Sequence, residues 1–445
     1  GGEGGKRGGK RGQKEREHDA RRLPSPEGPL AAGSVHPREQ RGGGKDGGKG
    51  DGRRRRGGGG GQPFGDDGHA EGGGYGGGGG GRGSGGKSRS SMGDARPHSN
   101  AMVEQLRSLG NDRNLDLGAL APHISEIAQD QYGSRLIQQK LEVASEADKQ
   151  LAFKAVLLKM PQLTTDVFGN YVVQKFFEFG SAEQRRILAE QLLGQVFKLS
   201  LHMYGCRVVQ KALDSVLIDQ QVLLIGELKG HVIACIEDQH GNHVIQKCIE
   251  SLPTDKIGFV VDSFHGQTAR MAKHCYGCRV IQRLIEYCAP EQLKPLLDEV
   301  LRTVMDLATD QYGNYVVQHA MEHSSRAGDR STIMAIVRQN ILSLSCHKYA
   351  SNVIEKALAC STYEERGLII DAITGTQAEQ HPPLLTMMRD RFGNYIVQRV
   401  IALAQGPQRD NLLWKLHEHM PALKKSNTYG KHIISALEKA ENAKD

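Results

Sequence analysis

The chain has 445 residues, a net charge of +7 and an aromatic content of only 5%. It is longer than one compact core accommodates, and it contains no apolar run near the ~18 residues that a membrane-spanning helix requires. Its eight cysteines form no recognisable disulfide framework, which favours a reducing compartment, and we expect a cytoplasmic protein.

Residues 1–100 differ in composition from the rest of the chain. They hold 36 of the 56 glycines and carry 20 Lys and Arg against 12 Asp and Glu, a net charge of +8, so that residues 101–445 carry −1. Such a segment cannot bury enough apolar surface to fold, and we predict a disordered, Gly/Arg-rich low-complexity tail. This basic tail could add weak, sequence-independent RNA affinity, and its Arg53–Arg56 block could be a nuclear import signal, although a solvated tail is the favoured interpretation.

Residues 101–445 contain a repeated helical cassette. After an expected N-terminal cap at about 106–121, a six-residue segment such as GNYVVQ recurs eight times within about 122–408, at spacings of 36, 36, 36, 36, 36, 37 and 43 residues. A fixed period in this range is typical of stacked repeats. We therefore predict an all-α solenoid of eight ~36-residue repeats with terminal capping repeats. The copies begin at Gly133, Gly169, Gly205, Gly241, Gly277, Gly313, Ala350 and Gly393.

Each cassette has an apolar side and a polar side. At ~100° per residue along a helix, Asn170, Tyr171 and Gln174 lie within one arc of about 100°. Val172 and Phe176 lie on a different side of the same helix. Because a single repeat could not bury its apolar side alone, that side should form the seam between neighbouring repeats. Stacking would then align the polar arcs into one exposed surface.

Three positions of the polar arc are of related type in every copy. The first position holds Ser134, Asn170, Cys206, Asn242, Cys278, Asn314, Ser351 and Asn394. The middle position holds Arg135, Tyr171, Arg207, His243, Arg279, Tyr315, Asn352 and Tyr395. The last position holds Gln138, Gln174, Gln210, Gln246, Gln282, Gln318, Glu355 and Gln398.

These residue types suit the reading of RNA bases. A Gln amide presents one donor and one acceptor, which matches uracil or adenine, whereas the Glu355 carboxylate presents only acceptors, which match the donors of guanine. Seven of the eight middle residues are flat and can stack on a base, each stack contributing ~1–3 kcal/mol. One such cassette would be an ordinary solvated surface, but eight copies in phase indicate a reader of one RNA base per repeat.

From about Leu106 to Lys439 the chain resembles the Pumilio-homology domain of the PUF family, and the resemblance covers all eight copies. In that family Asn with Gln reads uracil, Cys or Ser with Gln reads adenine, and Ser with Glu reads guanine. The C-terminal repeat takes the 5′ base. The resemblance therefore implies a right-handed solenoid whose first and last positions contact base edges and whose middle positions stack. The implied ligand is single-stranded RNA of sequence 5′-UGUAUAUA-3′.

The resemblance also implies a cellular role. It predicts a monomer that binds 3′ untranslated regions of mRNA and represses translation or promotes decay through deadenylase or translational-repression machinery. No enzyme activity, cofactor or membrane partner is expected. Two alternatives remain: a protein-binding helical scaffold, which would not need the three positions in register, and an rRNA-processing member of the same family.

A basic residue follows the last position in six copies. These residues could contact RNA phosphates. Acidic residues three positions later, such as Glu178 and Glu250, favour local ion pairs instead. The basic residues are Lys175, Lys211, Lys247, Arg283, Lys356 and Arg399.

No metal site is expected from the sequence. Cys275 and Cys278 form a CxxC pair, but no second pair of ligands follows at a suitable spacing. His319 and His323 are four residues apart, yet the HExxH order is absent, and we interpret them as surface residues.

Two features interrupt or end the repeats. The segment Thr374–Pro383 reads as an exposed loop, either a tolerated insertion or a surface for partners. A C-terminal cap is expected at about 409–440, and it should bind no base, because it has Lys431, His432 and Ser435 at the three reading positions.

Overall fold

The computed structural model describes Glu104, Leu106 and residues 116–326, 328–375, 382–425 and 429–442. The chain divides into two units, residues 1–90 and 91–445, and all described residues belong to the second. The predicted tail, most of the expected N-terminal cap and residues 376–381 of the expected loop lie outside the described residues. Every regular element in the described part is helical, and none of its helices is long and apolar enough to cross a membrane.

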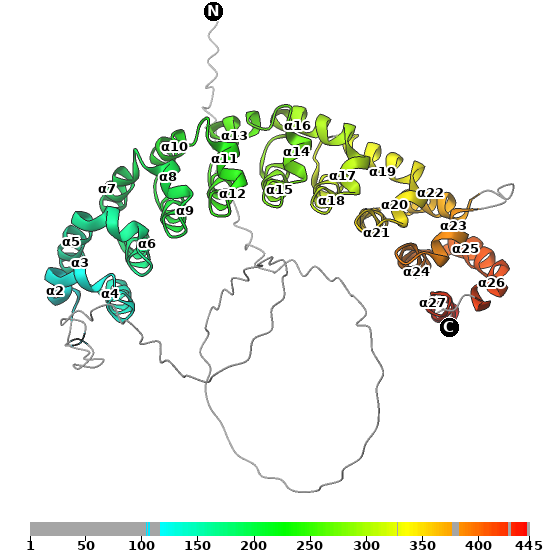
Figure 1. Cartoon of the computed structure of the whole chain (residues 1–445), viewed down its shortest axis with the longest axis horizontal. Helices are drawn as coiled ribbons and strands as arrows, with labels where there is room; N and C mark the ends of the chain where they lie inside the picture. Colours follow the sequence, from blue (N-terminus) through cyan, green and yellow to red (C-terminus); the bar gives the residue numbers. More distant parts are fainter. Residues whose placement is uncertain are drawn as a thin grey trace, which may run out of the picture. The chain divides into compact units, whose positions relative to one another are not determined.

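The second unit is built from helices in three rows (Figure 1). The inner row, on the concave side of the arc, is α4 (Gln131–Val143), α6 (Gly169–Phe179), α9 (Gly205–Ser215), α12 (Gly241–Ser251), α15 (Gly277–Tyr287), α18 (Gly313–His323), α21 (Ala350–Cys360) and α24 (Gly393–Leu403). The outer row is α5 (Glu146–Thr165), α7 (Ala182–Leu192), α10 (Ile218–Gly226), α13 (Gly258–Asp262), α16 (Pro290–Arg302), α19 (Asp329–Gln339), α22 (Tyr363–Thr374) and α25 (Gly406–Glu418).

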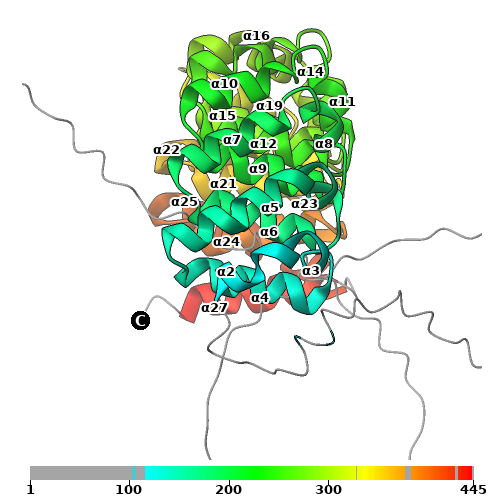
Figure 2. The same ribbon diagram turned by 90° about the vertical axis from the view of Figure 1, so that its left-hand side faces the viewer.

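Short middle helices connect the outer row to the next inner helix. They are α3 (Ile124–Ile127), α8 (Val196–Ser200), α11 (Val232–Glu237), α14 (Thr268–Ala272), α17 (Val304–Ala308), α20 (Ile341–Ser345) and α23 (Pro383–Arg389). The long helix α5 serves as both outer and middle helix between the first two repeats. Two 3-10 turns, η1 (Ala121–His123) and η2 (Thr254–Lys256), and helix α2 (Leu117–Leu120) complete the elements before α26. In a view turned by 90°, the outer helices α5, α7 and α10 lie one above the next on the side that faces the viewer (Figure 2).

The apolar sides of the cassettes form one continuous core, as the sequence predicts. In α6, Val172, Val173, Phe176 and Phe177 are fully buried. The same positions are buried in the other inner helices except α4, where Leu136 and Lys140 are half-buried. Each inner helix packs on the next, α6 on α9, α9 on α12 and so on to α24. Since burial continues across every junction, no repeat has a complete core of its own.

The glycine that begins most inner helices is required by close packing. A Cβ atom at Gly277 would lie 2.4 Å from the carbonyl oxygen of Met271 in α14, and one at Gly241 would lie 2.6 Å from that of Cys235 in α11. These distances are shorter than van der Waals contact, so a side chain would push the middle helix away. Repeat seven carries Ala350 at this place, where the methyl group is fully buried.

The C-terminal end extends the inner row. Helix α25 crosses the boundary near residue 408 that the sequence suggested for the end of repeat eight. It is followed by α26 (Met420–Lys425) and α27 (Gly430–Asn442), and α27 packs against α24. The terminal helix thus covers the apolar side of the last repeat.

Candidate RNA-binding surface

The middle positions of the cassettes are exposed along the inner row. Tyr171, Tyr315 and Tyr395 are 43%, 45% and 51% exposed despite their large apolar rings. The remaining middle residues are also exposed, namely Arg135, Arg207, His243, Arg279 and Asn352. Planar side chains held in the open at a constant spacing provide a series of stacking platforms.

The last positions lie beside these platforms. The seven Gln residues are half-buried, which restricts their side chains while leaving part of each amide accessible. Glu355 in α21 is exposed, and the described part of the chain contains no ion-pair partner for its carboxylate. Its neighbour Lys356 pairs with Glu322 of the preceding repeat instead.

The first positions are not exposed, contrary to the expectation from the helical arc. Asn170 and Asn242 are fully buried, and Cys206 and Cys278 are only 3% exposed. The reason is their place in the first helical turn, where the side chain folds back onto the preceding segment. Asn242 Nδ2 donates to the carbonyl oxygens of Asp238 and Gln239, at 2.9 and 3.0 Å.

The buried Asn side chains hold the Gln side chains. Gln246 Nε2 donates to Asn242 Oδ1 at 2.9 Å, across one helical turn. The same bond joins the other three Asn and Gln pairs, at 2.8 to 3.0 Å: Asn170 with Gln174, Asn314 with Gln318, and Asn394 with Gln398. Each of these Asn residues is therefore a positioning residue, since it fixes which way the Gln amide faces.

The two helices with Cys at the first position orient Gln differently. Gln210 Nε2 donates to the backbone oxygen of Cys206, and Gln282 Nε2 to that of Cys278, each at 3.0 Å. The thiols themselves face the turn: Cys278 Sγ lies 3.5 Å from the oxygen of Cys275. Burial raises the pKa of Cys278 to about 11, so this thiol stays protonated at neutral pH. The Gln side chain thus adopts one of two orientations, depending on whether Asn or Cys stands four positions earlier.

The residue that caps the start of the inner helix also differs between the Asn-led and the Cys-led helices, which was not predicted from the sequence. Before each Asn-led helix an Asp caps the helix start: Asp238 Oδ1 accepts from the backbone N–H groups of His240 and Gly241 at 2.8 Å. Before the Cys-led helices a His does so, as His202 Nδ1 accepts from Tyr204 and Gly205 at 3.2 Å. The signal is visible three residues before the first residue of each cassette, which is Asp130, Asp166, Asp238, Asp310 and Asp390 in five copies and His202, His274 and His347 in the other three.

The two Ser-led helices follow the same plan with a shorter side chain. Ser134 Oγ donates to the oxygen of Gln131 at 3.2 Å, and Ser351 Oγ to that of Lys348 at 3.4 Å. Neither hydroxyl reaches the last position of its own helix through a hydrogen bond in the described part of the chain. Gln138 and Glu355 are consequently not fixed by the residue four positions earlier in the way that Gln246 is.

Comparison with known proteins identifies this arrangement. A model of the Pumilio-family RNA-binding repeat matches residues 123–157, 159–193, 195–229, 231–263, 267–301, 304–337, 340–374 and 384–417, more than half of the chain. The chain belongs to the Pumilio (PUF) family. Membership in a family of RNA-binding repeats supports the prediction that the chain is not an enzyme.

Solved structures of Pumilio domains resemble the whole array. The structure of PUF-8 in complex with PBE-RNA has a TM-score of 0.73 and 35% identity, and covers 77% of this chain and 99% of that one. The Puf3 RNA-binding domain bound to the Cox17 RNA 3′ UTR recognition sequence site B has a TM-score of 0.68 and 35% identity, covering 78% and 100%. Both confirm the α-solenoid of eight repeats.

Relatives of known function match over shorter segments. The mRNA-binding protein PUF3 of Saccharomyces cerevisiae is 36% identical over 116 residues, which are 25% of this chain and 13% of that protein. Pumilio homolog 2 of Xenopus laevis is 48% identical over 75 residues, or 17% of this chain and 6% of that protein. The matched segments are thus a small part of these longer relatives.

Five of the six basic residues that follow the last position form ion pairs, namely Lys175, Lys211, Lys247, Arg283 and Lys356, whereas no ion pair is seen for Arg399 in the described part of the chain. Many of the pairs join neighbouring Pumilio repeats rather than residues of one helix. Lys175 lies 2.8 Å from Glu142 of the preceding repeat, Lys211 lies 3.4 Å from Glu178, and Lys247 lies 3.3 Å from Asp214. We call this series of inter-repeat pairs the charge ladder. Its Lys side chains are already partnered, which lowers their value as phosphate ligands.

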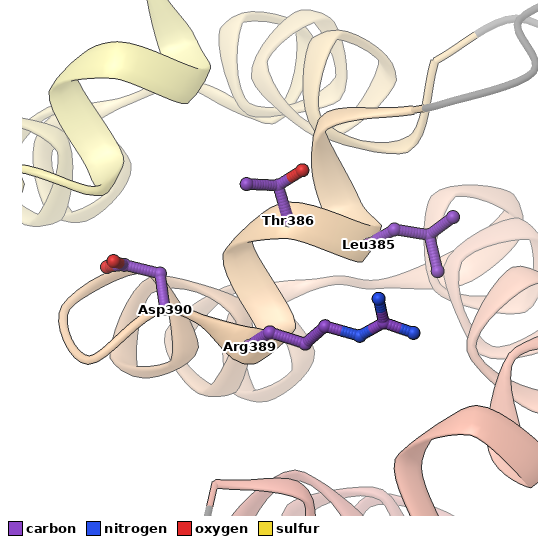
Figure 3. A pocket seen from close by; sticks show the side chains of 4 residues that line it. All are labelled: Leu385, Thr386, Arg389 and Asp390. Carbon is purple, nitrogen blue, oxygen red and sulfur yellow. The ribbon is translucent and has the colours of Figure 1, made fainter.

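A shallow pocket lies on middle helix α23, next to the start of inner helix α24 (Figure 3). Leu385, Thr386, Arg389 and Asp390 line it, and the side chains of Arg389 and Asp390 point apart. Asp390 already accepts from the backbone N–H groups of Phe392 and Gly393, both at 2.8 Å. This carboxylate therefore serves as the cap of α24.

Proposed function

We propose that this Pumilio protein binds single-stranded mRNA at 5′-UGUAUAUA-3′-type elements in 3′ untranslated regions, one base per repeat, with the 5′ base on α24. Two of the similar structures support this ligand class, since PUF-8 is in complex with PBE-RNA and the Puf3 domain is bound to a 3′ UTR recognition sequence. The exposed middle residues would stack between bases, and the last residues would meet base edges.

The observation that carries the sequence preference is the exposed, unpaired carboxylate of Glu355. Seven inner helices present an amide at this position, and α21 alone among the eight presents two acceptor oxygens. Guanine offers two adjacent N–H donors on its Watson–Crick edge, which a carboxylate can accept together. A base without those donors would leave the charge unpaired in the interface, so the second base of the element should be G.

The two orientations of the Gln side chain give a physical reason why one repeat would prefer uracil and another adenine. In the Asn-led helices the bond to Asn242 and its equivalents fixes the amide, leaving the Gln oxygen and one N–H for the N3–H donor and O4 acceptor of uracil. In the Cys-led helices the small thiol lies back against the turn, which leaves room for the larger purine. Because Gln alone fits either base, the first residue decides through orientation and space.

The test is RNA binding by the full chain at near-physiological salt. We expect tight binding to 5′-UGUAUAUA-3′ and a loss of roughly 10- to 100-fold on 5′-UAUAUAUA-3′, because a well-made bidentate base contact discriminates by about 1–3 kcal/mol. Glu355→Gln should reduce this difference, whereas Glu364→Gln on the outer helix α22 should keep it. Equal binding of both RNAs with a strong salt dependence would refute base readout and favour a protein-binding scaffold.

We further propose that binding in the cytoplasm represses translation or promotes decay of the bound mRNA through recruited deadenylase or translational-repression machinery. A reporter mRNA with UGUAUAUA in its 3′ untranslated region should be expressed less when the chain is present. Glu355→Gln should restore expression, and a UGUAUAUA-free reporter should not respond. Repression of both reporters alike would contradict this role.

A further inference from the structure

The charge ladder changes its chemistry between α15 and α18. At the position that follows Gln in α6, α9 and α12 there is a Lys, but in α18 it is His319. His319 Nε2 lies 3.0 Å from Glu286 Oε1 of α15, and His323 lies one turn further along α18. In the described part of the chain, these three side chains form the one group of three metal-ligating residue types whose donor atoms all lie within 4.8 Å of one another.

The two imidazoles are arranged on one face of α18. Residues four apart on a helix share a face, and the ring centroids of His319 and His323 are 4.3 Å apart. The side chain of His319 is only 12% exposed, and its Nε2 is buried without a well-aligned hydrogen bond, although Glu286 Oε1 is near. A buried ring nitrogen without such a bond costs free energy, which a ligand at this nitrogen would recover.

We propose that Glu286, His319 and His323 form a binding site for one divalent transition-metal ion of the Zn²⁺ class. Two imidazole nitrogens with one carboxylate oxygen are a donor set that Zn²⁺ and Co²⁺ accept, with the remaining coordination positions filled by water. Ligand atoms around a tetrahedral Zn²⁺ are about 3.3 Å apart, given metal–ligand bonds of about 2.0–2.1 Å. The three donor atoms lie within 4.8 Å of one another, and His323, whose side chain is 42% exposed, is free of close packing on its solvent side.

The surroundings hold the carboxylate in a usable orientation. Glu286 Oε2 lies 2.7 Å from Arg283, while Oε1 is the oxygen near His319. A second partner on the far oxygen is what commonly orients a metal-ligating carboxylate. Glu322 adds a further negative charge, with Oε2 3.3 Å from His323 Nε2, and Lys356 pairs with that same carboxylate.

A bound ion would join two reading helices. Glu286 comes from repeat five and both histidines from repeat six, immediately after the reading residue Gln318. In the rest of the ladder a Lys makes the equivalent contact, and an ammonium group cannot coordinate a metal. The metal would therefore strengthen this single junction and raise the melting temperature of the array, because it binds the folded state alone.

The test is metal binding by the full chain in a non-chelating buffer, with calorimetry for Zn²⁺ and visible absorption for Co²⁺. We expect His323→Ala and Glu286→Gln each to remove one site or weaken it at least tenfold, the range seen when metal-site partners are lost. His417→Ala is the matched control, because His417 also lies near a carboxylate, 2.6 Å from Glu441, but belongs to no three-ligand group in the described chain.

Two further readouts keep the result clear. Helical content by circular dichroism must match wild type in each variant, and His323→Gln replaces His323→Ala if that variant is not folded. Zn²⁺ should raise the melting temperature of the wild type and of His417→Ala, and not of His323→Ala or His323→Gln. The proposal is overturned if the number of bound ions, their affinity and the melting shift are the same in wild type and in both ligand variants. Glu286, His319 and His323 would then contribute only an ion pair to the charge ladder and no metal site.

Discussion

The Asn-led helices α6, α12, α18 and α24 and the Cys-led helices α9 and α15 carry the same Gln in two orientations. In the first group a buried amide bridges the preceding turn to Gln, and an Asp caps the helix start. In the second group the Gln amide donates to the backbone oxygen of the Cys, and a His caps the helix start. The comparison teaches that a buried side chain can set the orientation of its half-buried neighbour.

The largest effect should come from removing the buried amide. Asn242→Leu keeps the side-chain size but removes the side-chain donor to the oxygens of Asp238 and Gln239, of which only that of Asp238 keeps a backbone N–H donor. We expect a loss of about 2 kcal/mol in the free energy of unfolding, the usual cost of buried polar groups left without a partner. Urea unfolding followed by circular dichroism measures it.

The matched change in a Cys-led helix is Cys206→Ala. No buried amide is lost there, so the destabilisation should be less than half of that for Asn242→Leu. Equal losses in the two variants would mean that the Asn bridge does not distinguish the two groups of helices.

The second prediction converts an Asn-led helix into a Cys-led helix. Asn242→Cys should release Gln246 to the backbone and shift the preference of α12 from uracil toward adenine by about tenfold, near the lower half of the range for a base contact. The measurement is competition between 5′-UGUAUAUA-3′ and the RNA with adenine at the fifth base. An unchanged preference, with wild-type affinity for the uracil RNA, would assign the selection to another part of the helix.

The third prediction concerns the caps. Asp238→Ala removes the acceptor for two backbone N–H groups and should cost about 1 kcal/mol in unfolding free energy. His202→Ala should cost less, because its bonds are longer, 3.2 Å against 2.8 Å. Urea unfolding measures the loss of unfolding free energy in both variants. A larger loss for His202→Ala would contradict the view that the shorter Asp bonds make the stronger cap.

The smallest effect is expected from the middle position of α12, where His243 replaces the Tyr of the other Asn-led helices. Although His243 is exposed, partial desolvation of its ring by neighbouring residues, followed by the charge of Arg279, lowers its pKa below the ordinary 6.5. Its contribution to stability is therefore complete above about pH 6.5 and is lost as the pH falls through the lowered pKa. Between pH 8 and 7 His243 stays neutral, so the affinity of the wild type for RNA should not change with pH. The affinity of His243→Tyr should not change either. A tightening in wild type alone would indicate a protonated ring in the complex.

Much of this molecule could be predicted from the sequence because its period is regular. The inner helices, the buried positions of Val172 and Phe176 and the exposure of Tyr171 follow from helical geometry applied to a repeated pattern. The burial of Asn242 did not follow, because a helical projection gives direction and not depth: the first turn lies under the preceding segment. Glu286 was missed for a different reason, since its closeness to His319 depends on how adjacent repeats stack.

The charge ladder limits how freely repeats can be rearranged. Because Lys247 contacts Asp214 and His319 contacts Glu286, each of these repeats carries one partner of an ion pair whose other partner lies in the preceding repeat. A transplanted repeat would bring its base preference with it, since the Asn and Gln bond lies within one helix. It would also bring a charge that needs an opposite charge next door, so engineered arrays should exchange repeats together with their upstream acidic residue.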